Sequence, residues 1–186
     1  MSDLDLTVTP LDPARDAELI HGWVTQERAR FWMMGDHMLD EVREIYEWID
    51  EQDTHAAYLV RLNGRPVALF QTYDPRAEEI GAHYDVQDGD VGFHLLMGPS
   101  DAPVAGLTGA VVDLMGGFVF SDPQVGRIVG EPDARNAKMQ RLVDSRHMDR
   151  AGVVELEHKP ATLIFYTREQ FEADLAQRAF SNHASA

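Results

Sequence analysis

The chain has 186 residues and no cysteine, and its 32 acidic residues against 16 Lys and Arg give a formal net charge of −16. This length predicts one domain, and the lack of cysteine excludes disulfides, thiolate metal sites and a cysteine nucleophile. The acidic charge argues against nucleic acid and anionic membranes as partners. The first residues are acidic where a signal peptide is basic, and no apolar run approaches the ~20 residues of a membrane span. We therefore expect a soluble, cytoplasmic protein.

The first half of the chain alternates strand-like and helical patterns. Asp12 can cap the first helix, and Asn63-Gly64 between two β-rich runs is a strong hairpin signal. In chain order we predict a strand at 4–9, a helix at 13–24, an aromatic-rich segment at 28–34, a helix at 40–51, strands at 56–62 and 66–73, and an acidic loop at 74–90 with a short strand near 82–86.

The second half continues in the same way. We predict a central strand at 91–97, a helix at 104–120, a strand at 127–130, a helix at 135–145, strands at 153–157 and 161–167, a helix at 169–178 and a flexible tail at 179–186. This order predicts an α/β (α+β) domain over residues 1–178, with one mixed sheet and helices on both of its faces.

Two segments carry the chemistry. His94 lies in an apolar run that reads as a buried strand, followed by a Gly/Pro turn and an apolar helix. Asp133 stands at the exit of another apolar run, where a helix begins. A strand, a turn rich in backbone N–H groups and a helix N-terminus form an anion site, and a histidine and an aspartate beside it can act as an acid/base pair. Together the segments favour an acyl-coenzyme A transferase.

Each of these residues also has a purely structural interpretation. His94 can be a core histidine with one nitrogen satisfied, and Asp133 can be only the N-cap of the next helix. Arg135, Lys138 and Arg141 are spaced three apart, which is equally typical of a solvated helix face and of a set of phosphate contacts.

The order and spacing of ten short motifs resemble one family, the acyl-CoA N-acyltransferases of hydroxamate siderophore biosynthesis, a branch of the GCN5-related N-acetyltransferase (GNAT) superfamily. The motifs are Phe31-Trp32, Glu41–Trp48 (EVREIYEW), Thr54-His55-Ala56, Tyr73-Asp74-Pro75, Gly89–His94 (GDVGFH), Ser100–Val104 (SDAPV), Phe120–Pro123 (FSDP), Glu131–Asn136 (EPDARN), Lys159-Pro160-Ala161 and Thr167–Gln170 (TREQ).

The resemblance implies a GNAT-like fold with splayed central strands. It also implies transfer of an acetyl or succinyl group from acyl-CoA to the hydroxylamine nitrogen of an N-hydroxycadaverine-like diamine or of N6-hydroxylysine. His94 is then the group that accepts the nitrogen's proton, and Asp133 is a catalytic or substrate-orienting carboxylate. No metal is implied, and the protein is expected to be a monomer or homodimer.

The expected acyl-CoA contacts follow the strand of His94 and the helix after Asp133. They are Leu96, Met97, Ser100, Val104, Ala105, Gly106, Leu107, Thr108, Arg135, Asn136 and Lys138. Unlike many members of the family, the chain has no basic residue in the loop at 98–108, and no Lys or Arg stands between Arg76 and Arg127. Backbone donors must therefore dominate the phosphate contacts, or the distant cations must reach in.

The acceptor pocket is expected to be aromatic. Trp32 and Tyr73 fall at the ends of segments and are candidate pocket walls, and His55 stands at a strand entrance beside Thr54. Trp48 is a third candidate for the pocket wall, but it falls at helical spacing and is interpreted first as a core residue. The other histidines show no paired spacing typical of metal ligands.

Two other functions stay open. The chain could acylate an ordinary amine, such as an aminoglycoside or a plain diamine, or it could bind acyl-CoA without catalysis.

Overall fold

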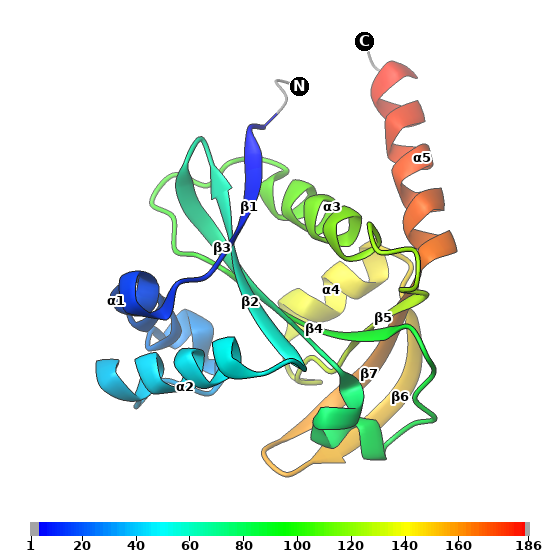
Figure 1. Ribbon diagram of the computed structural model, residues 1–186. Helices are drawn as coiled ribbons and strands as arrows, with labels where there is room; N and C mark the ends of the chain where they lie inside the picture. The colour runs from blue at the N-terminus through cyan, green and yellow to red at the C-terminus, as the bar shows by residue number, and fades with distance from the viewer. Residues whose placement is uncertain (1–3, 185–186) are drawn as a thin grey trace. The chain divides into compact units, whose positions relative to one another are not determined.

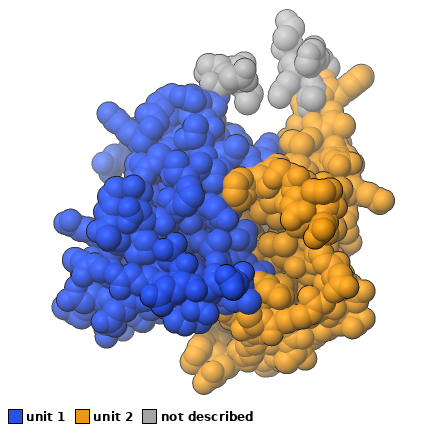
Figure 2. All heavy atoms as spheres, in the orientation of Figure 1, with its two compact units in different colours: residues 1–73, 94–115 blue, residues 74–93, 116–186 orange. Residues whose placement is uncertain are grey.

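The structure is a computed structural model that describes residues 4–184 (Figure 1). The chain divides into two compact units (Figure 2). Unit 1 comprises Met1–Tyr73 and His94–Met115, and unit 2 comprises Asp74–Phe93 and Gly116–Ala186. No described helix is long and apolar enough to cross a membrane.

Unit 1 begins with a strand and two helices that precede a hairpin. Asp12 caps the first helix as predicted, because its side chain accepts a hydrogen bond from the backbone N–H of Arg15. The elements are β1 (Leu6–Pro10), α1 (Pro13–Val24), the 3-10 helix η1 (Glu27–Trp32), α2 (Leu39–Glu51), β2 (His55–Leu62) and β3 (Arg65–Tyr73).

Unit 2 carries the remaining strands, and two elements are divided between the units. Strand β4 (Asp90–Met97) passes from unit 2 into unit 1 at His94, and α3 (Leu107–Val119) returns to unit 2 at Gly116. The others are the 3-10 helices η2 (Pro75–Ala77) and η3 (Glu79–Ala82), β5 (Arg127–Gly130), α4 (Ala137–Ser145), β6 (Asp149–Leu156), β7 (Lys159–Thr167) and α5 (Arg168–Ala184).

The strands form one seven-stranded sheet in the order β1-β2-β3-β4-β5-β7-β6. The β4–β5 pair is parallel, whereas β1–β2, β2–β3, β5–β7 and β6–β7 are antiparallel. The predicted mixed sheet is therefore confirmed.

The β2–β3 hairpin has a tight turn and one irregularity. Asn63 and Gly64 adopt positive φ values of 50° and 77°, as a two-residue hairpin turn with the twist of the strands requires. The register shifts next to this turn, since Arg61 pairs with Pro66 but Val60 pairs with Ala68. Val67 is thus the extra residue of a β-bulge, beside a proline that has no N–H for the ladder.

The core of unit 1 lies between the sheet and the first two helices. It contains residues from one face of β2, β3 and β4, namely Leu59, Leu69 and Leu96, packed with Ile20, Trp23 and Val24 of α1 and with Val42, Tyr46 and Ile49 of α2. In unit 2 a separate cluster joins the end of α3 to β7 and α5 through Val119, Phe120, Tyr166 and Phe171.

Several predicted boundaries are wrong. No strand forms at 82–86, where η3 ends at Ala82. Helix α3 begins at Leu107 rather than 104, after Gly106 with φ +79°, and α4 begins at Ala137 rather than 135. Helix α5 continues to Ala184, beyond the predicted end at 178. The predicted flexible tail stays a prediction, and its last two residues lie outside the described part of the chain.

Candidate functional site

A continuous row of rings in unit 1 contains the predicted base and all three predicted acceptor residues. The ring centroid of His94 lies 4.9 Å from that of Tyr73 and 6.1 Å from that of Trp32. Tyr73 stacks on His55 at 6.1 Å, and His55 lies 5.1 Å from Trp48. The structure therefore brings these side chains together as the sequence predicts.

Strand pairing explains the row. His55 pairs directly with Tyr73 across β2 and β3, and alternation places His94 on the same face of β4 as the core residue Leu96. The segment η1 supplies Trp32, and α2 supplies Trp48. Trp48 is half-exposed, so its interpretation as a core residue is wrong.

Gln71 orients His94. Its side-chain Oε1 lies 3.2 Å from His94 Nδ1. When the amide oxygen accepts this bond, Nδ1 carries the proton and Nε2 holds the lone pair that can accept another. No sequence pattern indicates Gln71, which lies two residues before Tyr73 on the same face of β3. At the other end of the row, Thr54 Oγ1 lies 2.9 Å from His55 Nδ1.

The carboxylate of Asp133, in unit 2, binds Arg135 and does not cap a helix. One carboxylate oxygen accepts from the Arg135 backbone N–H at 2.8 Å and from its Nε at 2.9 Å, and the other accepts from Nη2 at 2.7 Å. The N-cap of α4 is Asn136, which accepts from the backbone N–H of Met139. The interpretation of Asp133 as an N-cap is therefore wrong, because α4 begins later than predicted.

These bonds set the charge of Asp133. The hydrogen bond from the Arg135 side chain lowers the pKa of the Asp133 carboxyl below its usual value, although its burial at 4% exposure acts in the opposite direction. A carboxylate held ionised in this way is a poor proton acceptor at neutral pH but a firm negative charge. The predicted helix face with Arg135, Lys138 and Arg141 is wrong for Arg135, because this residue precedes α4 and pairs with Asp133. Lys138 and Arg141 lie exposed on the helix.

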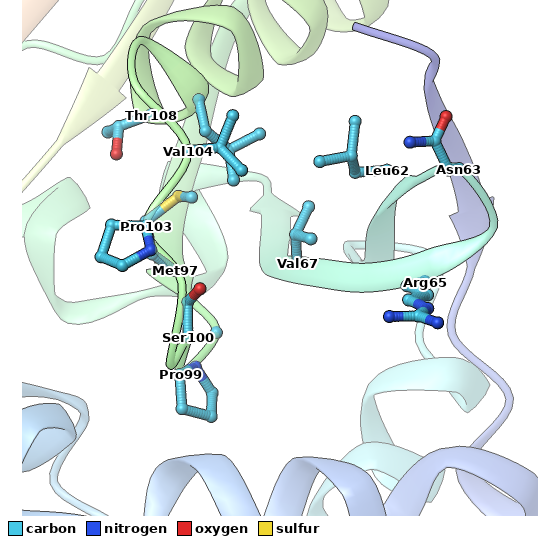
Figure 3. A pocket seen from close by; sticks show the side chains of 12 residues that line it. Leu62, Asn63, Arg65, Val67, Met97, Pro99, Ser100, Pro103, Val104 and Thr108 are labelled. Carbon is cyan, nitrogen blue, oxygen red and sulfur yellow. The ribbon is translucent and has the colours of Figure 1, made fainter.

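A pocket of about 600 Å³ lies within unit 1, near the tip of the hairpin. Figure 3 shows hairpin residues on one side of it and residues of the segment 97–108 on the other. Five predicted acyl-CoA contacts line it: Met97, Ser100, Val104, Leu107 and Thr108. The bulge residue Val67 contributes to the opposite wall.

The other predicted acyl-CoA contacts do not line this pocket. Leu96 has its side chain in the core of unit 1, Ala105 and Gly106 are exposed in the turn before α3, and Arg135, Asn136 and Lys138 belong to unit 2. Their contacts with acyl-CoA stay predictions.

Sequence reasoning missed the cation at this pocket. Arg65 lines it from the hairpin, together with Asn63. Arg65 lies far in sequence from the loop at 98–108, and only the pairing of β3 beside β4 brings the two segments together; the Gly98 N–H donates to the Val67 carbonyl at 2.7 Å. Within residues 4–184, no group of three or more His, Asp or Glu side chains is arranged to hold a metal ion.

Comparison with known proteins gives the family. The model of the acetyltransferase (GNAT) domain matches residues 12–156. An N-hydroxyputrescine acetyltransferase from Acinetobacter baumannii is 25% identical over 158 residues, which cover 84% of this chain and 75% of that protein. An N(6)-hydroxylysine O-acetyltransferase from Escherichia coli is 29% identical over 168 residues, which cover 86% of this chain and 51% of that protein.

The fold agrees with this result. The crystal structure of the aminoglycoside acetyltransferase AAC(6')-Ib in complex with coenzyme A superimposes with a TM-score of 0.78, covering 91% of this chain and 98% of that one at 24% identity. The resemblance to acyltransferases of hydroxylated amines is confirmed by the names of the relatives. Since the family model spans most of its length, the chain belongs to the acetyltransferase (GNAT) domain family and is an acyl-CoA-dependent acyltransferase.

Proposed function

We propose that this enzyme forms hydroxamates, by moving an acetyl or succinyl group from acyl-CoA to the hydroxylamine nitrogen of an N-hydroxylated diamine or of N6-hydroxylysine. The observation that carries the proposal is His94, set between Trp32 and Tyr73 with its Nδ1 beside Gln71. The relatives named for N-hydroxyputrescine and N(6)-hydroxylysine support it. A cytoplasmic location and a monomeric or dimeric state stay predictions.

A single histidine is sufficient as the proton acceptor in this reaction. The nitrogen lone pair attacks the thioester carbonyl, the N–H proton passes to His94 as the tetrahedral intermediate forms, and the C–S bond then breaks to release coenzyme A. A primary alkylamine has a pKa of about 10.4 and must first lose a proton at neutral pH. A hydroxylamine is far less basic and stays neutral, so His94 needs only to collect the proton late in the reaction.

Asp133 and the pocket near the hairpin have separate parts in the proposal. Asp133, with its charge fixed by Arg135, orients a substrate or stabilises a positive charge rather than taking the proton. The pocket holds part of acyl-CoA between the turn before α3 and the hairpin, where Arg65 faces its phosphates.

An acyltransferase for a plain amine is the second candidate, since an aminoglycoside N(6')-acetyltransferase from Klebsiella pneumoniae is 24% identical over 84% of this chain.

The acceptor tests the proposed function. We expect strong preference for N-hydroxycadaverine, N-hydroxyputrescine or N6-hydroxylysine over the plain amines, because a site built to hydrogen-bond a substrate hydroxyl rejects the analogue without it by as much as about 10⁴–10⁵. The measurement is release of free thiol from acetyl-CoA and succinyl-CoA with each acceptor. Equal rates on cadaverine and N-hydroxycadaverine would favour the plain-amine enzyme.

His94→Ala is expected to lower kcat by roughly 10²–10⁴, the usual effect of removing a general base. Binding of acetyl-CoA, measured by calorimetry, should change little. Gln71→Leu serves as the matched comparison, since it keeps the imidazole but removes its partner, and should cost less than the loss of His94. Wild-type turnover in His94→Ala would remove this residue from the mechanism.

Asp133→Asn and Arg135→Ala should separate charge from position. Asp133→Asn removes the charge and should abolish most activity. Arg135→Ala keeps the carboxylate but removes the side-chain hydrogen bond that contributes most to lowering its pKa, so that pKa should rise relative to the wild type. The carboxylate is ionised above its pKa, so the acid limb of the pH–rate profile should move to higher pH in Arg135→Ala while the neutral rate largely survives. An unchanged acid limb, or full activity of Asp133→Asn, would contradict a role for this charge.

Arg65→Ala should weaken acetyl-CoA binding by about two- to fivefold, because an exposed ion pair contributes at most about 1 kcal/mol. The dissociation constant should also depend less on salt than in the wild type. Arg141→Ala, which removes an exposed cation from α4 outside this pocket, is the matched control. A larger loss from Arg141→Ala than from Arg65→Ala would place the phosphates elsewhere.

A further inference from the structure

We propose that Trp48 binds the cationic far end of the acceptor, as the last ring of the row that starts at His94. The inference rests on the proposed function and names the chemistry that selects among its acceptors: a linear amine with a second ammonium group. Helical spacing favours a core position for Trp48 over a place in the acceptor pocket, and it does not indicate a cation site.

The exposure of Trp48 is the first observation. Helix α2 buries Val42, Tyr46 and Ile49 in the core, whereas half of the Trp48 surface is open. A large indole left in water forgoes the hydrophobic stabilisation that burial gives, so a partner that covers its face would stabilise it. Among residues 4–184, no Lys or Arg lies over this ring, unlike the rings of Phe31, Phe120 and Phe165.

The position of Trp48 is the second observation. Its ring centroid lies 5.1 Å from His55, which stacks on Tyr73, which in turn contacts His94. Tyr73 is 4% exposed and supports the row from beneath, so an acceptor with its reacting nitrogen at His94 meets the half-buried ring of His55 and, at the end of the row, the half-exposed ring of Trp48. The rings supply an apolar wall for methylene groups, and they come from three strands and a helix that hold them in place.

The charge around Trp48 is the third observation. Glu44 and Glu51 stand four residues before and three residues after it, so both share its face of α2. Neither carboxylate forms an ion pair within the described residues. The far amine of a diamine has a pKa of about 10.4 and is an ammonium at neutral pH. A cation over the face of a tryptophan, with carboxylates beside it, is attracted by both the ring and the acids.

The test varies the ring and the acceptor together. Wild type and Trp48→Leu are compared on N-hydroxycadaverine and on N-hydroxypentylamine, which has the same chain without the far amine. We expect Trp48→Leu to lower kcat/KM for the diamine by about 2- to 30-fold, the range of a cation–π contact, mainly through KM. The effect on N-hydroxypentylamine should stay within about twofold of wild type, and Trp48→Phe should recover part of the loss on the diamine.

Two controls make the result specific. Phe118→Leu changes an aromatic residue of α3 that is 39% exposed and should leave the ratio between the acceptors unchanged. Glu44→Gln with Glu51→Gln should lower activity on the diamine more than on the neutral acceptor. An equal loss on both acceptors in Trp48→Leu, or no loss on either, overturns the inference.

Failure of the proposed function has a different signature. If the wild type acylates neither hydroxylamine but acylates cadaverine, the hydroxamate proposal falls, and the same variants are compared on cadaverine and pentylamine. A loss confined to the diamine then still supports Trp48 as the cation site, and an equal effect on both amines overturns it.

Discussion

One extra residue in β3 decides whether the rings of His55 and Tyr73 lie on the same face of the sheet. Starting from the Leu62–Arg65 pair at the turn, an unbroken ladder would pair His55 with Thr72 and turn Tyr73 to the other face of the sheet. Val67 shifts the register by one, so that His55 pairs with Tyr73. Because side chains alternate with a period of two, a slip of one residue exchanges the faces completely. The bulge is therefore the constraint on which the aromatic row depends.

The same bulge also contributes to the pocket on the opposite face of these strands in unit 1. Met97 alternates with Leu96 along β4, so it points away from the core and toward the pocket lined by Val67 and Arg65. The row of rings and the pocket thus occupy opposite faces of the same strands. A short hairpin with a rigid turn fixes both, which allows the proposed acceptor and part of the proposed acyl-CoA site to be positioned by one supersecondary element.

Sequence patterns are sufficient for most helices and strands and for the aromatic residues beside His94, but not for Gln71 or for the geometry of the site. Periodicity gave the helices, the mixed sheet and the Asn63-Gly64 turn. It could not give the bulge, because Pro66-Val67 reads as ordinary strand, and so the register came only from the structure. Helical spacing alone does not say which side of α2 faces the core, so it wrongly predicts a core position for Trp48. The alternative interpretation of Asp133 as an N-cap fails because Asp and Asn both cap helices well, and the N-cap of α4 is Asn136, three residues later.

The net charge of −16 acts differently on the two proposed substrates. An acidic surface attracts a protonated diamine and repels a polyanion such as acyl-CoA. Many arginines are already paired with acids of the chain, as Arg15, Arg127 and Arg135 are with Asp16, Asp90 and Asp133. In the proposed acyl-CoA site, backbone N–H groups near α3 therefore supply most of the phosphate contacts, with Arg65 as local support. The acidic surface weakens the binding of the proposed acyl-CoA donor and strengthens the binding of a cationic acceptor. This difference favours an enzyme that selects its substrates mainly by the amine.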